Sequence, residues 1–436
     1  MKKNLFFIAA VVLGSSTLSC SSSDKIDDEP KSVINMLEEP EPVRLTEAQR
    51  VFANDNNQFS LNFLRMVNNA DKSGKSFIFS PLSITYVLGM VNDAAAGQTE
   101  SELEQTLGFH QGGIQAVNEY CRKLIYGLPK VDNNVHLNIA NAIFLNKDYT
   151  LRQQFQEDMQ QYYDAKAEAL DFSSSNTLNH INDWCNEKTN GMIPSILDEV
   201  NPYMVSYLLN AIYFKAEWAN KFDEKNTKVE SFATEDGPIQ LPQMHQNVLI
   251  SYMKNETYSA VVIPYGSGLW DMTVLLPEEG KTTDDVINEV TQNNPSDLNN
   301  RRWFATDGNT FSAHEVDLKL PRFETKSDTD DFGGDGLIDL LKPMGIQLAF
   351  NRELAEIPNM ANVPVYIAMM RQKAAIKVNE EGSEAAAVTV AGMYETSSIG
   401  PREYPTATFH ANRPFVYVIR EQSSGVILFV GKFTGQ

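Results

Sequence analysis

The sequence predicts an α+β fold with more than one β-sheet, and three observations lead to this prediction. Helical patterns dominate up to about residue 200, whereas short apolar runs typical of strands dominate the rest of the chain. The strands do not alternate regularly with helices, which argues against a parallel βαβ arrangement. With 436 residues, of which 42% are hydrophobic, the chain is long and apolar enough to bury a large core.

The N-terminus has the layout of an export signal. Lys2 and Lys3 precede the apolar run 5–13, which is too short to span a bilayer, and small residues precede Cys20. Residues 16–20 resemble a bacterial lipobox, in which the cysteine is acylated after cleavage; ordinary signal cleavage nearby is the alternative. We therefore expect a signal peptide over residues 1–19 and lipid attachment at Cys20.

Residues 21–45 are rich in Ser, Asp, Glu and Pro and lack apolar periodicity, so residues 20–46 are predicted to be a lipidated N-terminus and flexible acidic tether. The acidic residues resemble a signal that places some Gram-negative lipoproteins on the cell surface, although any solvated linker would look similar. The predicted protein is an exported outer-membrane lipoprotein, with surface exposure as one option and the N-terminal lipid as its only membrane contact. A net charge of −21 argues against nucleic acid as a partner.

Two helices are indicated after the tether by their end signals. Ser80 and Pro81 read as an N-cap and a first helical residue, and the run 82–96 is apolar nearly all round, which predicts a central helix. Thr99 and Glu102 have the spacing of a capping box, and Gly108 reads as the stop of a short surface helix. A further helix is predicted around residues 181–185, with its end at 189–191.

Strands are predicted where apolar runs are short or alternate with polar residues. Residues 207–214 form a nearly continuous apolar run typical of a strand buried on both faces. The last two predicted strands flank residues 421–425 and read as a hairpin. All the strands predicted after residue 214 are 260–264, 272–276, 316–320, 365–370, 374–378 and the two hairpin strands 415–419 and 426–430.

Motifs for catalysis are absent from the sequence, so an enzyme is not expected. There is no HExxH, GxSxG or GxxxxGK[ST] pattern, and His180 and Cys185 lie in one predicted helix, whereas catalytic Cys and His are usually far apart. The acidic stretch from Asp328 partly matches a calcium loop, but Phe332 stands where an oxygen ligand is needed, which favours a surface turn. No cofactor or metal is predicted. Cys121 and Cys185 are expected to be buried free thiols, with a disulfide as the alternative.

Residues 379–393 form the most unusual segment of the sequence. In an extended conformation alternate side chains would fall on opposite faces, and one of these faces would be small and uncharged throughout. Such a segment could enter an existing sheet as an added strand without burying a charge. A short helix is the alternative for residues 383–387. The small face would carry Ser383, Ala385, Ala387, Thr389, Ala391 and Met393.

The sequence of this segment closely resembles the hinge of the serpins, a family of protease inhibitors. Other motifs resemble serpin signatures in the family's order: 79–84 (FSPLSI), 210–215 (NAIYFK) with Trp218, 320–323 (LPRF), 344–345 (MG) and 412–415 (NRPF). The resemblance covers residues 47–436 and implies one domain of three β-sheets and eight to nine helices with an exposed reactive-centre loop. The matching hinge residues are Glu380, Glu381, Gly382, Ser383, Glu384, Ala385, Ala386, Ala387 and Val388.

The resemblance also implies how the protein works. A protease would cleave the loop, and the freed hinge would insert into the main sheet and trap the protease as a covalent acyl complex. By analogy the sheet opens near Ser80, Ser83, Asn210, Trp218 and Gln372. Gln372 stands where many serpins have a histidine, and this departure leaves the energetics of sheet opening in question. The fold is not in question, because glutamine can still donate and accept hydrogen bonds.

The usual hinge-to-cleavage spacing of the family places the reactive bond at Thr396 and Ser397. The target would then be an elastase-like or subtilisin-like serine protease with a shallow pocket, and a cysteine protease is a further option. Because the stretch after Ser397 is a few residues longer than usual, Met393, Tyr394 and Arg402 are alternative sites. A monomeric inhibitor is expected, and a non-inhibitory serpin that acts as a surface binding protein is the alternative function.

Overall fold

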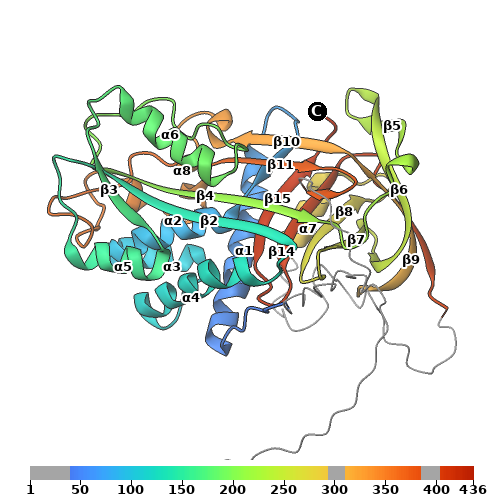
Figure 1. Ribbon diagram of the computed structural model, residues 1–436, viewed down its shortest axis with the longest axis horizontal. Helices are drawn as coiled ribbons and strands as arrows, with labels where there is room; N and C mark the ends of the chain where they lie inside the picture. The colour runs from blue at the N-terminus through green and yellow to red at the C-terminus, as the bar shows by residue number, and fades with distance from the viewer. Residues whose placement is uncertain (1–39, 293–309, 384–402) are drawn as a thin grey trace, which may run out of the picture. The chain divides into compact units, whose positions relative to one another are not determined.

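The computed structural model describes residues 40–292, 310–383 and 403–436, and these residues form an α+β fold, as predicted (Figure 1). The described chain contains eight α-helices. They are α1 (Glu47–Ala70), α2 (Pro81–Ala94), α3 (Gly97–Leu107), α4 (Gly113–Gly127), α5 (Gln153–Tyr163), α6 (Asn176–Lys188), α7 (Thr283–Gln292) and α8 (Leu337–Leu341). Among the described residues, none of the helices has both the length and the apolar character that a membrane span requires.

A six-stranded sheet runs in the order β10-β11-β12-β4-β2-β3. The long strands β2 and β4 pair antiparallel along their whole length, and the two-residue strand β12 lies between β4 and β11. The strands are β10 (Phe323–Asp328), β11 (Lys373–Val378), β12 (Gly382–Ser383), β4 (Ser206–Glu217), β2 (Val135–Asn146) and β3 (Lys166–Leu170).

The other nine strands form a second sheet in which the long strand β6 joins two sections. One section continues from β6 through β7 to β1, and the other contains β5, β9 and β13. The strands are β1 (Phe77–Phe79), β15 (Ile427–Phe433), β14 (Phe415–Glu421), β8 (Trp270–Pro277), β7 (Tyr258–Tyr265), β6 (Gly237–Lys254), β9 (Ser312–Pro321), β13 (Thr406–His410) and β5 (Lys228–Thr234).

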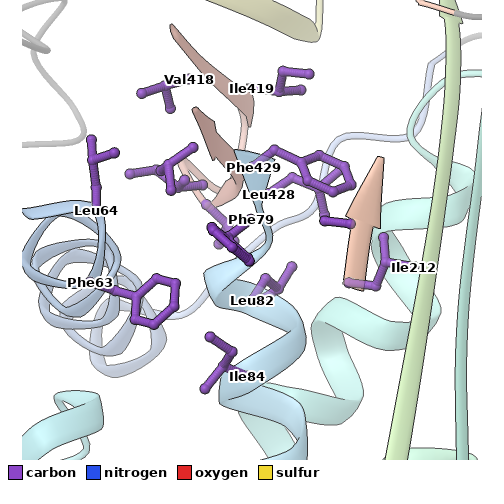
Figure 2. Packing of buried hydrophobic residues seen from close by; sticks show 14 of the residues in the cluster. Phe63, Leu64, Phe79, Leu82, Ile84, Ile212, Val418, Ile419, Leu428 and Phe429 are labelled. Atoms are coloured by element: carbon purple, nitrogen blue, oxygen red, sulfur yellow. The ribbon is translucent and has the colours of Figure 1, made fainter. Parts of the chain in front are cut away.

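Helix α2 is the central helix that its all-round apolar sequence predicts. Its N-cap is Ser80, whose side chain accepts a hydrogen bond from the backbone of Ser83, and Pro81 is the first helical residue. The helix contacts β4 of one sheet and β15 of the other. Figure 2 shows side chains of α2, α1, β14 and β15 in the same buried cluster. The N-terminus of α2 is thereby fixed between the two sheets.

Helix α6 packs on the opposite face of the six-stranded sheet from α2 (Figure 1). Ile181 and Cys185 of α6 join a separate small core with apolar residues of β2 and β4. Cys185 and the distant Cys121 are both buried and free, as expected. The connection 189–205 leads from α6 into β4, and Asn182 holds it by accepting hydrogen bonds from the backbone N–H groups of residues 196 and 197.

The structure corrects two local predictions. Thr99 and Glu102 do not form a capping box, because α3 begins two residues before Thr99 and both side chains have distant partners. The Thr99 hydroxyl accepts from the Glu356 N–H, and Glu102 accepts from the backbone of residues 347 and 348. Residues 365–370 are not a strand; they have strand-like alternating burial, but no ladder partner within the described part of the chain.

The end of the predicted tether packs against the fold. Val43 and Leu45 are buried, the Val43 N–H donates to Ser423 Oγ, and the Glu41 N–H donates to the carbonyl of Val131. Residues 40–46 therefore contribute to the folded unit that includes α1.

Candidate functional site

The short strand β12 already occupies a place inside the six-stranded sheet. Gly382 and Ser383 pair with Glu217 and Ala216 of β4, and Ser383 also pairs with Val378 of β11. Gly382 has φ +152°, and an added Cβ atom would lie 2.1 Å from the carbonyl oxygen of Ala216, so only glycine fits here. The predicted hinge thus begins as an inserted strand.

Ser383 is the last hinge residue that the structure describes, and it is 1% exposed. Its hydroxyl lies 2.7 Å from the hydroxyl of Tyr265 on β7. Burial raises the pKa of Tyr265 far above its usual value, so its hydroxyl stays protonated and able to donate. The side chain of Ser383 therefore faces the core, and the residues at alternate positions after it would face the same way in a continuing strand.

Two glutamates hold the chain just before β12. The buried Glu380 carboxylate accepts from Arg322 (Nη2–Oε1 2.6 Å, Nε–Oε2 3.1 Å) and from the Thr227 hydroxyl at 2.6 Å. Burial favours the neutral form of Glu380, but the hydrogen bonds from Arg322 and Thr227 outweigh it and lower the pKa. Glu381 lies 2.6 Å from Lys221, a more exposed pair. The start of the loop is thus held by two ion pairs as well as by the strand pairing of β12.

Trp218 contacts the backbone of the segment that carries these glutamates. Its ring stacks on Tyr265 with centroids 4.3 Å apart, and its indole Nε1 donates to the carbonyl oxygen of Asn379 at 2.9 Å. The Trp218 backbone N–H donates to the carbonyl oxygen of Glu381. Trp218 therefore contacts the chain on the approach to β12.

The four polar residues predicted where the sheet opens meet at the N-terminus of α2. The Gln372 side chain accepts from the Ser80 N–H at 3.0 Å and donates to the Ser80 carbonyl oxygen at 2.8 Å. The Ser83 hydroxyl donates to Asn210 Oδ1, and Asn210 Nδ2 donates to Asn141 on β2. Asn210 on β4 and Gln372, just before β11, are thus fixed separately to the same helix end.

Away from β12, the six-stranded sheet is split into two halves. One half contains β4, β2 and β3, and the other contains β10 and β11. Within the described residues, no backbone hydrogen bond joins β4 to residues 363–372 or to β11. A cavity of about 1120 Å³ lies between them. Residues 203–212 line one side, residues 363–374 line the other, the first turns of α2 lie at one face, and Cys185 and residues 193–199 lie at the opposite face.

The structure describes some of the predicted site residues. Glu380, Glu381, Gly382 and Ser383 lie at or just before β12. The predicted polar residues lie around the N-terminus of α2. The remaining hinge residues, both residues of the predicted reactive bond and its three alternatives lie outside the described residues. Sequence reasoning gave no role to Thr227, Lys221 and Tyr265, whose contacts with the hinge are long-range. Arg322 was visible as part of the motif 320–323 and Glu380 as part of the hinge, but their pairing was not predicted.

The structure also describes the residues that the sequence analysis considered for a thiol dyad and for a calcium loop. His180 pairs with Glu168 at 3.0 Å, and burial raises the pKa of the Cys185 thiol to about 12, so it is not a nucleophile at neutral pH. Asp328 of the predicted acidic turn binds the guanidinium of Arg371. In the described part of the chain, no cluster of three or more His, Cys, Asp or Glu is arranged to hold a metal ion.

Comparisons with known proteins identify one family. The family model Serpin (serine protease inhibitor) matches residues 54–435. Serpin B6 of Macaca fascicularis is 30% identical over 88% of this chain and 99% of its own length, and neuroserpin of Gallus gallus is 30% identical over 83% and 87%. Among solved structures, the native state of the thermophilic serpin tengpin has a TM-score of 0.74 at 24% identity, covering 90% of this chain and 95% of its own. Human thyroxine-binding globulin has a TM-score of 0.73 at 25% identity, covering 88% and 98%. The chain belongs to the serpin family.

Proposed function

We propose that the chain inhibits serine proteases by a single cleavage in the segment after Ser383. The protease serine attacks the carbonyl carbon of Thr396, the peptide bond to Ser397 breaks, and the new amine departs with a proton from the enzyme's general acid. The ester that remains links protease and inhibitor. Continued insertion of the hinge then carries the protease away from the cleavage point and distorts its active site before water hydrolyses the ester.

The observation that carries this proposal is the position of β12. The two-residue strand β12 already separates β4 from β11. In the rest of the sheet, a cavity lies between the edge of β4 and residues 363–374. Ser383 faces the core, so in a strand that continued from it Ala385 and Ala387 would fall on the same side. Their small apolar side chains suit such burial.

Two substitutions test the mechanism. Ala387→Arg would place a charge on the core-facing side of the inserting strand, so insertion slows and the protein becomes a substrate that is cleaved without forming a complex. Ala386→Arg, one position earlier, is the matched control because in the inserting strand its side chain would project to the opposite face, where we expect a smaller loss. The chain from residue 20 with Cys20→Ser is mixed with elastase-, subtilisin-, chymotrypsin- and trypsin-type proteases.

The measurement is a denaturing gel together with mass spectrometry of the cleaved loop. A complex that survives denaturation supports the proposal and identifies the reactive bond among Thr396, Met393, Tyr394 and Arg402. Cleavage by every protease with no complex would instead favour a binding protein, a role that the name of thyroxine-binding globulin gives to a protein of this fold. An equal stoichiometry of inhibition for Ala387→Arg and the unmodified protein would contradict the mechanism.

We further propose that the inhibitor works outside the cytoplasm, as a monomer held to the outer membrane by a lipid on Cys20. The export signal, the lipobox-like residues and the acidic segment after them support this proposal. Globomycin, which blocks lipoprotein signal cleavage, should cause the precursor to accumulate, and Cys20→Ser should release the protein from the membrane fraction. Unchanged fractionation of Cys20→Ser would contradict it.

A further inference from the structure

A cluster of charged side chains spans the split between the two halves of the six-stranded sheet. Its centre is Arg371, whose side chain is 11% exposed. The guanidinium contacts three carboxylates: Asp198 (Nη1–Oδ2 2.6 Å), Asp328 (Nη2–Oδ2 2.5 Å) and Asp330 (Nε–Oδ2 2.9 Å). The neighbouring Lys373 ammonium lies 3.8 Å from Asp198 and 3.6 Å from Asp328.

The three carboxylates do not belong to the same half of the sheet. Asp328 ends β10, which pairs with β11 such that Asp328 lies opposite Lys373, and Asp330 follows directly. These two carboxylates therefore move with Arg371. Asp198 lies instead in the connection 189–205, at one face of the cavity between the two halves.

The connection that carries Asp198 is fixed to the half that contains β4 and β2. Leu197 N–H donates to Asn182 Oδ1 on α6, and Asn182 Nδ2 donates back to the carbonyl oxygen of Leu197. Leu197 and Ile196 are buried in the small core with residues of β2 and β4. Asp198 follows immediately, so its carboxylate joins this half of the sheet to Arg371 on the other half.

An inserted strand changes the distance that this contact spans. Neighbouring strands lie about 4.8 Å apart, so a strand between β4 and β11 requires edges about 9.6 Å apart along its whole length. Beside β12 that spacing exists, because β12 pairs with both neighbours. At the level of Arg371 the Asp198 carboxylate, fixed to α6, would have to follow the movement or release the guanidinium.

We propose that Asp198, through its contacts with Arg371 and Lys373, is a positioning residue that restrains the two halves of the sheet and slows strand insertion. Its effect on the rate of insertion rests on the proposed function, whereas its restraint on the halves of the uncleaved sheet does not. The hydrogen bond from Arg371 also lowers the pKa of Asp198, so the carboxylate is ionised at neutral pH. Asp328 and Asp330 keep Arg371 partnered when Asp198 is changed.

Asp198→Asn is the test, because it removes the charge at a largely exposed side chain without leaving Arg371 unpaired. Asp171→Asn is the matched control. Asp171 pairs with Lys147 at 2.8 Å, and its side chain is 44% exposed, against 69% for Asp198. Asp171 and Lys147 lie just after β3 and β2, both in one half of the sheet. Arg371→Ala is unsuitable, since it would leave the Asp328 carboxylate without its main cation.

The first readout is hydrogen–deuterium exchange of the uncleaved protein. In Asp198→Asn the amides of residues 206–210 and 371–375 should exchange about two- to fivefold faster than in the unmodified protein, and 0.5 M NaCl should reduce the difference because it screens the ion pair. Asp171→Asn should leave these amides unchanged. Equal exchange in Asp198→Asn and the unmodified protein would overturn the restraint.

The second readout is the rate of insertion after cleavage by a subtilisin-type protease, followed by the fluorescence of tryptophan, including Trp218 beside the hinge. Asp198→Asn should insert about fivefold faster, equivalent to the ~1 kcal/mol of a well-formed surface ion pair. An unchanged insertion rate would overturn the effect on insertion even if exchange rises. If cleavage of the unmodified protein does not raise its melting temperature, the proposed function fails, and the exchange experiment still decides the restraint.

Discussion

The carboxylate of Glu380 is the buried charge at the point where the loop leaves the six-stranded sheet, and Glu380→Gln tests how firmly that end is held. Glutamine keeps the size of the side chain and one acceptor oxygen but removes the negative charge. Both hydrogen bonds from Arg322 and the one from Thr227 are affected. Because Arg322 donates to both carboxylate oxygens, the N–H₂ group of glutamine would face a donor of Arg322 in either orientation of the amide.

The expected loss follows from these contacts and from exposure. A hydrogen bond to a charged group contributes about 1.5–3 kcal/mol, and breaking a fully buried ion pair costs about 3–5 kcal/mol. The Arg322 side chain is 46% exposed, whereas that of Glu380 is 3% exposed, so water can solvate Arg322 after the substitution. We therefore expect the free energy of unfolding of the native form to fall by about 2 kcal/mol at pH 7.

The pH dependence of this loss has a definite sign. The pKa of Glu380 is lower in the folded protein than its unfolded value of about 4.3. The contribution of the ionised carboxylate to stability is therefore complete above the unfolded pKa and is lost as the pH falls through the lower folded pKa. The difference between the unmodified protein and Glu380→Gln should be largest above about pH 5 and should shrink below the unfolded pKa.

Urea unfolding of both proteins between pH 7.5 and pH 3 measures this difference. Glu381→Gln is the control, because the Glu381 carboxylate is 34% exposed against 3% for Glu380, and its pair with Lys221 should contribute at most about 1 kcal/mol. A loss for Glu380→Gln no larger than that for Glu381→Gln, or one that stays constant down to pH 3, would refute the reasoning.

Three further substitutions follow from the same structure. Gly382→Ala should lower the unfolding free energy by about 2 kcal/mol and expose the hinge to limited proteolysis, because its Cβ would lie 2.1 Å from the Ala216 carbonyl oxygen; an unchanged urea midpoint would contradict this. Trp218→Phe should cost about 1 kcal/mol in urea unfolding, since the indole hydrogen bond to the Asn379 carbonyl is lost. Burial raises the pKa of Asp93 to about 6, so this acid costs stability when the pH rises from 4 to above 6. Asp93→Asn should therefore stabilise the protein by about 1–2 kcal/mol at pH 8 and by less at pH 4, and equal effects at both values would contradict the assignment.

Local signals in the sequence predicted the elements whose ends are set by their own residues. Ser80 and Pro81 start α2 because a hydroxyl N-cap and a proline at the first position satisfy the helix end without distant partners. The run 207–214 became the buried strand β4 because nearly every side chain in it is apolar. The hinge was recognisable because its Glu-Glu-Gly sequence and the small residues after it resemble the serpin hinge.

Predictions failed where a distant partner competed with a local one. Thr99 and Glu102 have the spacing of a capping box, but Thr99 accepts from Glu356 and Glu102 from residues 347 and 348, far along the chain. The Glu380–Arg322 and Asp198–Arg371 pairs were invisible for the same reason. A charge in a sequence indicates a need for a partner, but only the topology of the sheets decides which partner is near.

Residues 365–370 show why a strand pattern and a strand are different things. The alternation of their burial is real, but a strand also needs a neighbour for its backbone groups, and in the described structure β4 does not supply one. Backbone N–H and C=O groups on both sides of the split are therefore available to a strand that enters between them. If about ten residues entered and each formed roughly one hydrogen bond, at about 1 kcal/mol net per bond the gain would be of order 10 kcal/mol. That is as large as the whole stability of a typical domain. The failed strand prediction and the proposed mechanism thus share one cause: an edge whose pattern suits a sheet partner that the described chain does not provide.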